Sequence, residues 1–384
     1  MIRLVHVTTA PQTLWFLHGQ VGYLKDRGVD VWAVSSPGEM LDQFAAREGI
    51  PVHELEMARR ITPLRDLATT LRLWWWLRQV RPDIVNAHTP KGGLLGMLGA
   101  WLARVPVRVY HMHGLPLMTA AGLRRRLLWW AERVSCLLAH QVFCVSDSLR
   151  AAAVSEGLCR PEKMAVIHHG SINGVAAETA FNPAAVGAMA RDRTRSHSGI
   201  PLDAEVLGFV GRVVRDKGLV ELIDAWQTLR VERPGLHLLV VGTLEPQDPL
   251  PPDVEQLMRT DPRVHLAGFS SDTPKFYSAM DVVVLPTYRE GFGLVAIEAA
   301  AMELPVVATL VPGCVDAVQD GVTGTLVPPR DAVGLTEAIR RYLLDPDLRR
   351  RHGRAGRERA LRDFRQEDIW EELYAEYTRL LRLH

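Results

Sequence analysis

Short apolar runs alternate with helix-length amphipathic segments along the whole chain, and this alternation restricts the fold more than any other feature. In the first half, the apolar runs lie near residues 2 to 8, 29 to 34, 83 to 87, 107 to 111, 141 to 145 and 164 to 168. In the second half, residues 206 to 210 and 282 to 285 each lead into glycines and then a helical pattern. Strands separated by helices form parallel sheets with helices on both faces. We therefore predict an α/β fold of doubly wound parallel sheets.

The length of the chain predicts more than one domain. A chain of 384 residues is too long for one small core, and 47% apolar with 23% charged residues is typical of a soluble globular protein. The turn signal Asn173-Gly174 and a polar stretch at residues 191 to 198 mark a connection. We predict two domains, at residues 1 to 170 and 204 to 365. Residues 171 to 203 form the connection between them, and residues 366 to 384 form a final helix.

The turn after residues 282 to 285 combines glycines with two glutamates. Gly291 and Gly293 open the following helix, whose free N–H groups attract an anion such as a diphosphate. Glu290 lies at this turn and Glu298 in the helix, where carboxylates can accept hydrogen bonds from sugar hydroxyl groups. Considered alone, two glutamates at this spacing are more often a loop residue and a solvated helix residue.

A second strand-to-helix connection carries two cations. After residues 206 to 210 the chain continues as Gly211-Arg212-x4-Lys217-Gly218, and a helical pattern covers residues 219 to 229. Arginine binds phosphate through its bidentate fork and lysine as a point charge. Each cation alone would be interpreted as a surface charge. Together with the two glutamates they predict a site for a sugar nucleotide.

These two motifs resemble those of the GT4 family of retaining glycosyltransferases, whose GT-B fold has two Rossmann-like domains facing across a cleft. The motifs are Gly-Arg-x4-Lys-Gly at residues 211 to 218 and Glu-Gly-Phe-Gly-x4-Glu-Ala at residues 290 to 299. The resemblance implies that the Arg and Lys of the first motif bind the donor diphosphate. It implies that the first Glu of the second motif contacts the donor sugar and the second Glu the ribose. The donor-binding residues implied in this way are Gly211, Arg212, Lys217, Glu290, Gly291, Phe292, Gly293, Leu294 and Glu298. The final helix is expected, on resemblance only, to cross back onto the first domain.

Candidates for acceptor binding follow two strands of the first half. Lys91 lies where a helix begins after residues 83 to 87, so it can receive a phosphate together with the helix start. His113 follows the strand near residues 107 to 111, and the resemblance implies that such a histidine lies near the reacting centre. Histidine is suited to orienting a hydroxyl or contacting an acceptor phosphate near neutral pH. A lone histidine is more often structural, so this assignment depends on the resemblance. The predicted catalytic residues are His113, Arg212, Lys217 and Glu290.

The charge of the chain is unevenly distributed. The net charge is +1, but residues 1 to 200 carry 23 Lys and Arg against 15 Asp and Glu, a net charge of +8 that leaves −7 for residues 201 to 384. The resemblance implies that the donor binds in the C-terminal half and the acceptor in the N-terminal half. A basic first half therefore favours an anionic acceptor or an anionic membrane surface.

Two segments combine arginine with tryptophan. Residues 71 to 81 and 123 to 133 together hold five of the ten tryptophans. A helix in the headgroup region of a membrane uses such residues, with rings at the interface and guanidinium groups on lipid phosphates. The alternative is a pair of core helices with inward-facing tryptophans, and we weigh the two interpretations equally. A mixed arrangement would bury Trp75 and Trp129 and leave the neighbouring residues free to contact lipid.

The cysteines and the apolar segments indicate the compartment. The four cysteines, at positions 136, 144, 159 and 314, form no C-x-x-C pair, which favours a reducing environment. Residues 1 to 8 have the pattern of a strand and not of a secretory signal. No uncharged apolar stretch reaches the roughly 18 residues that span a bilayer. We predict a cytoplasmic protein that is peripheral at the inner face of the cell membrane.

The motifs and the resemblance together predict a retaining, metal-independent glycosyltransferase. Thr89-Pro-Lys91 and the turn at residues 170 to 174 resemble the family members that build capsule and O-antigen on undecaprenyl diphosphate carriers. The expected reaction moves a hexose or N-acetylhexosamine from a UDP-sugar to a lipid-linked saccharide. The expected partners are the nucleotide sugar, this acceptor and an anionic membrane surface, with no nucleic acid. No Asp-x-Asp motif is placed to hold an ion on the diphosphate, so we expect neither metal nor cofactor.

Two other functions are compatible with the same architecture. A nucleotide-sugar 2-epimerase would leave the basic and aromatic segments of the first half without a role. A non-catalytic protein would bind the donor without turnover. A dinucleotide-dependent oxidoreductase would need G-x-G-x-x-G after a strand, and the sequence has no such motif.

Overall fold

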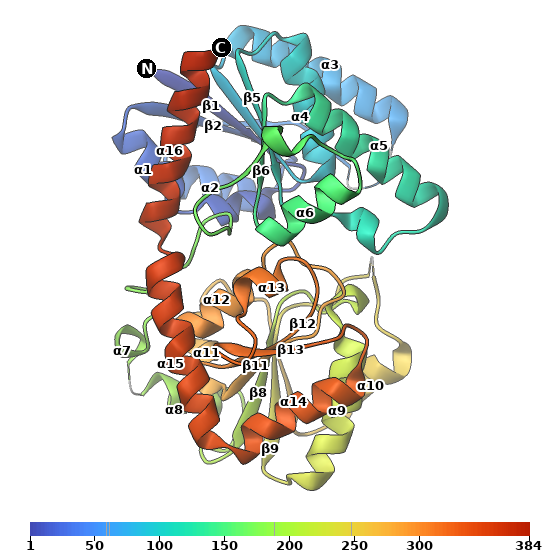
Figure 1. Cartoon of the computed structure of the whole chain (residues 1–384), viewed down its shortest axis with the longest axis vertical. Helices are drawn as coiled ribbons and strands as arrows, with labels where there is room; N and C mark the ends of the chain where they lie inside the picture. The colour runs from blue at the N-terminus through green and yellow to red at the C-terminus, as the bar shows by residue number, and fades with distance from the viewer. Residues whose placement is uncertain (59, 61, 188, 247) are drawn as a thin grey trace. The chain divides into compact units, whose positions relative to one another are not determined.

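The chain folds into two compact units, each built on one sheet (Figure 1). The computed structural model describes residues 1–58, 60, 62–187, 189–246 and 248–384. The first unit consists of Met1–Asn173 and Gln366–His384, and the second of Gly174–Arg365. Every paired strand is parallel to its neighbour, which confirms the predicted α/β fold with two parallel sheets.

The sheet of the first unit has seven strands in the order β3-β2-β1-β4-β5-β6-β7. Its strands are β1 (Ile2–Val7), β2 (Val29–Ser35), β3 (Val52–Glu54), β4 (Ile84–His88), β5 (Val107–Met112), β6 (Gln141–Cys144) and β7 (Met164–Val166). The central strands β4, β5 and β6 are almost wholly buried, as expected for a parallel sheet with helices on both faces, although each also contains polar residues. The sequence analysis does not predict β3, because Val-His-Glu has only one apolar residue in three, whereas the other three-residue edge strand, β7, is apolar throughout (Met-Ala-Val) and was predicted.

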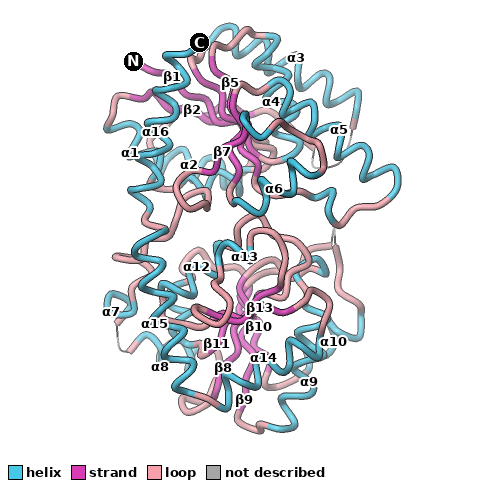
Figure 2. Tube along the Cα trace, viewed as in Figure 1, coloured by secondary structure: helices cyan, strands magenta, loops and turns pink. Residues whose placement is uncertain are grey.

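Helices cover both faces of this sheet (Figure 2). The α-helices of the first unit are α1 (Gln20–Asp26), α2 (Glu39–Glu48), α3 (Pro63–Val80), α4 (Pro90–Leu102), α5 (Gly122–Leu138), α6 (Asp147–Ser155) and α16 (Gln366–Leu383). Short 3-10 helices are η1 (Pro11–Leu17), η2 (Pro116–Met118) and η3 (Pro161–Lys163). α4 packs on β4 and β5, with α3 and α5 on either side of it. A Cβ at Gly93 would lie 2.3 Å from the Tyr110 ring, so α4 lies this close only because of its glycines.

The C-terminal helix α16 belongs to the first unit, although it follows the second unit in the sequence. The Nδ2 of Asn86 on β4 donates a hydrogen bond of 2.6 Å to the Tyr377 hydroxyl on this helix. The indole N–H of Trp370 donates to Asn173 Oδ1 at 2.6 Å. Asn86 and Ala87 point to opposite faces of the sheet, and α4 approaches Ala87, so α16 covers the face opposite α4.

The sheet of the second unit has six strands in the order β10-β9-β8-β11-β12-β13. Its strands are β8 (Glu205–Val210), β9 (Leu236–Val241), β10 (Val264–Gly268), β11 (Val282–Leu285), β12 (Val306–Thr309) and β13 (Gly324–Val327). Its helices are α7 (Pro183–Val186), α8 (Ala190–His197), η4 (Arg215–Lys217), α9 (Leu219–Glu232), α10 (Pro252–Thr260), α11 (Pro274–Ala279), α12 (Leu294–Ala301), α13 (Cys314–Ala317), α14 (Ala332–Leu344) and α15 (Pro346–Asp363). Trp226 of α9 is fully buried in the core between this helix and the sheet.

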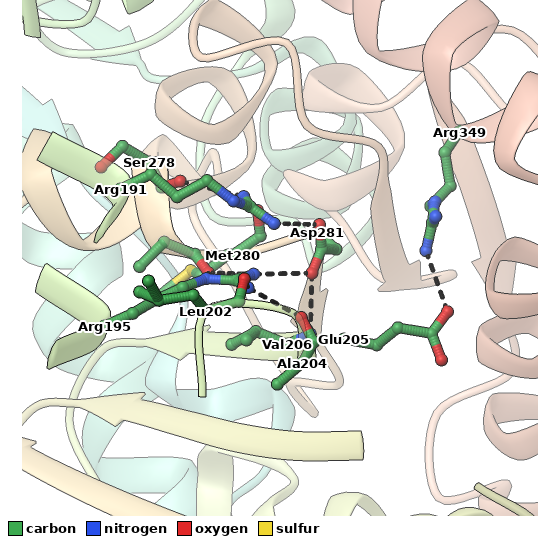
Figure 3. A network of polar contacts seen from close by, with 11 residues as sticks. Arg191, Arg195, Leu202, Ala204, Glu205, Val206, Ser278, Met280, Asp281 and Arg349 are labelled. Atoms are coloured by element: carbon green, nitrogen blue, oxygen red, sulfur yellow. Dashed lines mark hydrogen bonds and ion pairs between the residues drawn. The ribbon is translucent and has the colours of Figure 1, made fainter. Parts of the chain in front are cut away.

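A buried arginine fixes α8 within the second unit (Figure 3). Arg195 is 1% exposed, and its guanidinium donates to the carbonyls of Leu202, Ala204 and Ala279 and to the carboxylate of Asp281. Asp281 also accepts from Arg191 and from the Val206 N–H at the start of β8. The polar stretch that the sequence assigns to the connection at 171 to 203 thus includes a helix that packs on α11 within the second unit.

Candidate active site

The loops that follow β8 and β11 are joined through Asp216. The backbone carbonyl of Asp216 accepts from the Tyr288 N–H at 2.9 Å and from the Thr287 hydroxyl at 3.2 Å. Its carboxylate pairs with Arg289 at 2.7 Å. Two adjacent parallel strands end side by side, so these contacts fix the segments that carry Lys217 and Glu290 against one another.

Glycines at two positions allow the backbones of these loops to touch. Gly218 has a φ of +70°, and a Cβ there would lie 1.9 Å from the Pro286 carbonyl oxygen. Gly313, after β12, has a φ of +84°, and a Cβ there would lie 2.5 Å from the Gly291 carbonyl. Glycine adopts this left-handed conformation without strain, and it has no Cβ to collide with the neighbouring backbone. The sequence gives Gly218 a place in its motif, whereas its contact with Pro286 is visible only in the structure.

Lys217 and Glu290 form an ion pair at the carboxyl ends of β8 and β11. Their side chains are 17% and 20% exposed, so the pair is largely buried but keeps some contact with solvent. Burial raises the pKa of Glu290, but the charge and hydrogen bond of the Lys217 ammonium and the Gly291 N–H together outweigh it and leave the pKa lowered. Glu290 is therefore a carboxylate at neutral pH, able to accept hydrogen bonds from hydroxyl groups.

The structure brings together only part of the predicted donor site. Arg212 is about half exposed, and its guanidinium pairs with Glu245 at 3.1 Å. Its convergence with Lys217 on one diphosphate therefore stays a prediction for the ligand-bound protein. Sequence reasoning did not identify Glu245, which lies beyond β9 in a loop without a motif.

Glycine precedes α12, where the sequence predicts that Gly291 and Gly293 open a helix. Gly211 is at the end of β8, and Gly293, with a φ of +79°, is the N-cap of α12, which begins at Leu294. The ring of Phe292 packs against Phe364 with 5.3 Å between ring centroids. The Phe292 side chain is thus part of the core, so any contribution of residue 292 to an anion site would come from its backbone.

Glu298 lies on α12 and has a different environment from Glu290. Its carboxyl group accepts a hydrogen bond of 2.8 Å from the Tyr277 hydroxyl. Burial raises the pKa of Glu298 to about 7, and the Tyr277 hydrogen bond only partly counteracts this. Two carboxyl groups of one predicted site therefore differ in protonation: Glu290 is ionised near neutral pH, while Glu298 titrates there.

The raised pKa of Glu298 predicts a pH dependence of stability. The unfolded chain loses this proton near the usual carboxyl pKa of 4.5, whereas the folded chain keeps it up to about 7. Folded protein binds more protons between these values, so this residue lowers stability progressively as the pH rises through that window. Glu298→Gln should therefore gain melting temperature relative to the wild type between pH 5 and pH 7.5. A difference between the two melting temperatures that does not change with pH would contradict this assignment.

The predicted acceptor residue Lys91 is at the start of α4. Its ammonium pairs with Asp66 of α3 at 2.7 Å and donates to the Arg60 carbonyl at 2.5 Å. The side chain is 16% exposed, so a phosphate would have to compete with Asp66 for it. The sequence did not predict Asp66 as a partner of Lys91, because the position of Asp66 indicates only the start of a helix.

The predicted acceptor residue His113 belongs to a chain of histidines. His88 Nδ1 and His113 Nε2 lie 2.9 Å apart, and His88 Nε2 and His6 Nδ1 also lie 2.9 Å apart. The ring of His111 is stacked on that of His88 with 5.4 Å between centroids. Burial, with the neighbouring histidines, lowers the pKa of His88 and His113 well below the usual value. Burial also lowers the pKa of His6 to about 3 and of His111 to about 4, so all four rings are neutral at pH 7.

The clustering of these histidines follows from strand register, which sequence reasoning did not use. His88 and His111 are directly opposite each other on β4 and β5, and His6 is opposite Asn86 on β1 and β4. Alternate residues share a face, so these positions and His113 lie on the same face of the sheet. Knowing the order β1-β4-β5 would have been sufficient to find the cluster.

Both halves of the chain match glycosyltransferase families. Residues 190–359 match the model "Glycosyl transferases group 1", and residues 16–171 match "Glycosyltransferase Family 4". Over 383 residues the chain is 33% identical to the capsular polysaccharide biosynthesis glycosyltransferase CapM of Staphylococcus aureus, which spans 99% of this chain and 98% of the relative. It is 26% identical over 295 residues to the UDP-Gal:alpha-D-GlcNAc-diphosphoundecaprenol alpha-1,3-galactosyltransferase of Escherichia coli, over 76% of this chain and 74% of the relative.

Solved structures show the same fold at lower sequence identity. HepE of Anabaena, crystallised with UDP-glucose, has a TM-score of 0.81 and 21% identity, covering 98% of this chain and 100% of that chain. Sucrose-phosphate synthase of Thermosynechococcus elongatus has a TM-score of 0.80 and 22% identity, covering 100% of both. The two parallel-sheet domains are those of the GT-B fold. The chain belongs to the glycosyltransferases of group 1 and family 4.

Proposed function

We propose that this glycosyltransferase moves a hexose or N-acetylhexosamine from a UDP-sugar to a lipid-linked saccharide, with retention at the anomeric carbon, in the synthesis of a surface polysaccharide such as capsule. The observation that carries the proposal is the Lys217–Glu290 pair at the carboxyl ends of adjacent strands. In open α/β sheets this edge is where ligands bind. The pair offers one cation for a diphosphate and one carboxylate for sugar hydroxyl groups.

The proposed reaction at the donor site requires stabilisation of the leaving diphosphate by positive charge more than it requires a general base. As the glycosidic bond breaks, negative charge builds up on the leaving diphosphate, and a fixed cation stabilises it most strongly at that stage. Lys217 and, after release from Glu245, Arg212 supply that charge, with the backbone at Gly291 to Leu294 as further donors. These cations take the role that a bridging ion has in other transferases, so we propose transfer without a metal at the diphosphate.

The choice of UDP and of a lipid-linked acceptor is supported by relatives. HepE was crystallised with UDP and with UDP-glucose, and the Escherichia coli relative is described as using UDP-Gal and a diphosphoundecaprenol-linked sugar. On the acceptor side, Lys91 and His113 remain our candidates for contact with a phosphate or hydroxyl. The relatives named above are transferases, so neither the 2-epimerase nor the non-catalytic alternative is favoured.

Thermal stabilisation of the purified chain by nucleotides tests the donor class. A ligand present at about 100 times its dissociation constant stabilises the folded state by roughly 2.7 kcal/mol. UDP and UDP-sugars should raise the melting temperature more than GDP and GDP-sugars at equal concentration. Incubation with a radiolabelled UDP-sugar and membrane lipids should then move the label into the organic phase. A larger shift with GDP compounds, or conversion of UDP-N-acetylglucosamine to its epimer without an acceptor, would contradict the proposal.

A helix layer of the first unit supports peripheral binding to an anionic membrane. None of the helices in the described part of the chain is long and apolar enough to cross a membrane. The helices α3, α4 and α5 lie side by side (Figure 1) and expose large apolar side chains. These are Leu64, Leu67, Leu71, Trp75, Trp101, Leu102, Leu123, Leu127, Trp130 and Leu137. Exposed arginines of α3 and α5 lie among them, at positions 65, 72, 78, 124 and 126.

One detail of the sequence interpretation is wrong for these helices. Trp75, expected to face the core in a mixed arrangement, is 63% exposed. The inward positions of α3 are held instead by Thr69, Thr70, Leu73 and Leu77. Trp129 is partly buried, as expected, and its indole N–H donates to the Glu156 carbonyl at 2.8 Å.

Removing two of the exposed rings should weaken membrane binding. Trp75→Ser combined with Trp130→Ser should lower the affinity for phosphatidylglycerol vesicles by at least about tenfold, because burying each ring contributes roughly 1.5–3 kcal/mol. Phe269→Ser is the matched control, since Phe269 is 70% exposed but lies in the second unit. Co-sedimentation with vesicles measures the difference. Equal losses of vesicle affinity in the double variant and in the control would exclude this face as the membrane contact.

A further inference from the structure

We propose that His88, His111 and His113 form a binding site for a divalent transition-metal ion of the zinc class in the first unit. The three residues each offer a ring nitrogen, and these ligand atoms all lie within 4.8 Å of one another. Imidazole is the ligand that zinc, nickel and copper ions share, and a set of three histidines with one open position is an established zinc arrangement. The sequence predicts no metal site, and this one is built from residues of the first unit, whereas the predicted diphosphate-binding residues belong to the second unit.

The spacing of the rings is close to that of a coordinated ion. Two nitrogens at the usual 2.0–2.1 Å from a tetrahedral ion are about 3.3 Å apart. His88 Nδ1 and His113 Nε2 are 2.9 Å apart, so an opening of a few tenths of an ångström would admit the ion between them. A metal would thus replace one hydrogen bond within a cluster that is already assembled by the ends of β4 and β5.

The third ligand is an independent reason to expect an ion. His111 is 4% exposed, and its Nδ1 is buried without a hydrogen-bond partner among the described residues. A buried polar nitrogen without a partner costs free energy, which a bond from His111 Nδ1 to the metal would offset. His113 is only partly buried, which leaves one side of the cluster for solvent or a fourth ligand.

A second layer of residues orients the proposed ligands. With His88 Nδ1 bound to the ion, its Nε2 would donate to His6 Nδ1, 2.9 Å away. Such a hydrogen bond on the far nitrogen fixes the tautomer of a metal-binding histidine. Phe143 packs its ring on His111, with 5.9 Å between centroids, and excludes water from that side. Occupation would engage His113, so the ion is also expected to slow sugar transfer.

Binding of Co²⁺ to the chelator-treated full chain, prepared without a histidine tag, tests the site directly. We expect one equivalent of Co²⁺ to give the intense visible absorption of a tetrahedral site, and Zn²⁺ to displace it. His111→Gln should weaken binding by at least about tenfold, since even partners of metal ligands contribute 10–100-fold. His265→Gln is the control, because His265 belongs to a histidine pair with His237 in the second unit.

Two results would overturn the proposal. One is the absence of tetrahedral Co²⁺ absorption in the wild type. The other is equal metal affinity in His111→Gln and His265→Gln, which would mean adventitious binding elsewhere. If His111→Gln does not fold, histidine-ring NMR signals of the wild type decide instead. On addition of Zn²⁺, the rings of His88, His111 and His113 should shift and that of His265 should not, and the reverse pattern would refute the site.

Discussion

Replacing Lys217 by alanine should lower kcat for sugar transfer by about 10²–10³-fold, the usual effect of removing one charge-stabilising group from an active site. The ammonium lies beside Glu290 and is held there by the joined loops after β8 and β11. Its effect should fall mainly on kcat, because charge on the diphosphate is greatest in the transition state. Steady-state kinetics with saturating UDP-sugar measures the change.

Two further variants separate the role of Lys217 in catalysis from its role in folding. Lys217→Arg keeps the positive charge and should recover part of the activity. Lys275→Ala removes a lysine of the same unit that pairs with Asp272 at the surface, and it should leave kcat unchanged. Melting temperatures of all three variants show whether the fold is intact. An intact Lys217→Ala protein with wild-type kcat would remove Lys217 from the mechanism.

Replacing Asp281 by alanine should cost about 3–5 kcal/mol of stability, because it leaves a buried guanidinium without its counterion. Arg195 is 1% exposed and pairs with Asp281 at 3.0 Å, while the same carboxylate holds Arg191 and the Val206 N–H (Figure 3). Replacing Asp281 would thus weaken the contacts that hold α8, α11 and the start of β8 to one another. Unfolding in urea measures the loss.

The matched control for this prediction is Asp272→Ala. Asp272 also pairs with a cation, Lys275, but both side chains are largely exposed, at 64% and 45%. An exposed pair contributes about 0–1 kcal/mol, so the control should unfold close to the wild type. Equal losses in the two variants would mean that the buried network does not hold the unit together.

The alternation of apolar runs and helical patterns was sufficient to predict two parallel sheets, although in the second unit it placed only β8 and β11 by residue number. Strands with continuous apolar sequence, such as residues 282 to 285, can be recognised without knowledge of the fold. The edge strand β3, Val-His-Glu, has one apolar residue in three and gives no such signal. The polar segment at residues 191 to 198 looked like a connection because a single sequence does not reveal that Arg195 finds carbonyls and Asp281 in the interior.

The candidate site shows the same division between local and long-range information. The glycines and charges after β8 and β11 form local motifs, so the sequence alone identified them as candidate site residues. The Lys217–Glu290 contact depends on two strands being neighbours, and it joins residues 73 positions apart. The histidine cluster was missed for the same reason, since His6, His88 and His111 converge only when β1, β4 and β5 are placed in order.

The most direct test of the account is calorimetric binding of uridine, UDP and a UDP-sugar to the wild type, Lys217→Ala and Glu290→Gln. Lys217→Ala should keep the uridine affinity but weaken UDP by about tenfold to a hundredfold, since a hydrogen bond to a charged group contributes roughly 1.5–3 kcal/mol. Glu290→Gln should bind UDP as the wild type does and lose the added affinity for the sugar. Unchanged UDP affinity in Lys217→Ala, with the protein folded, would contradict the proposed donor site.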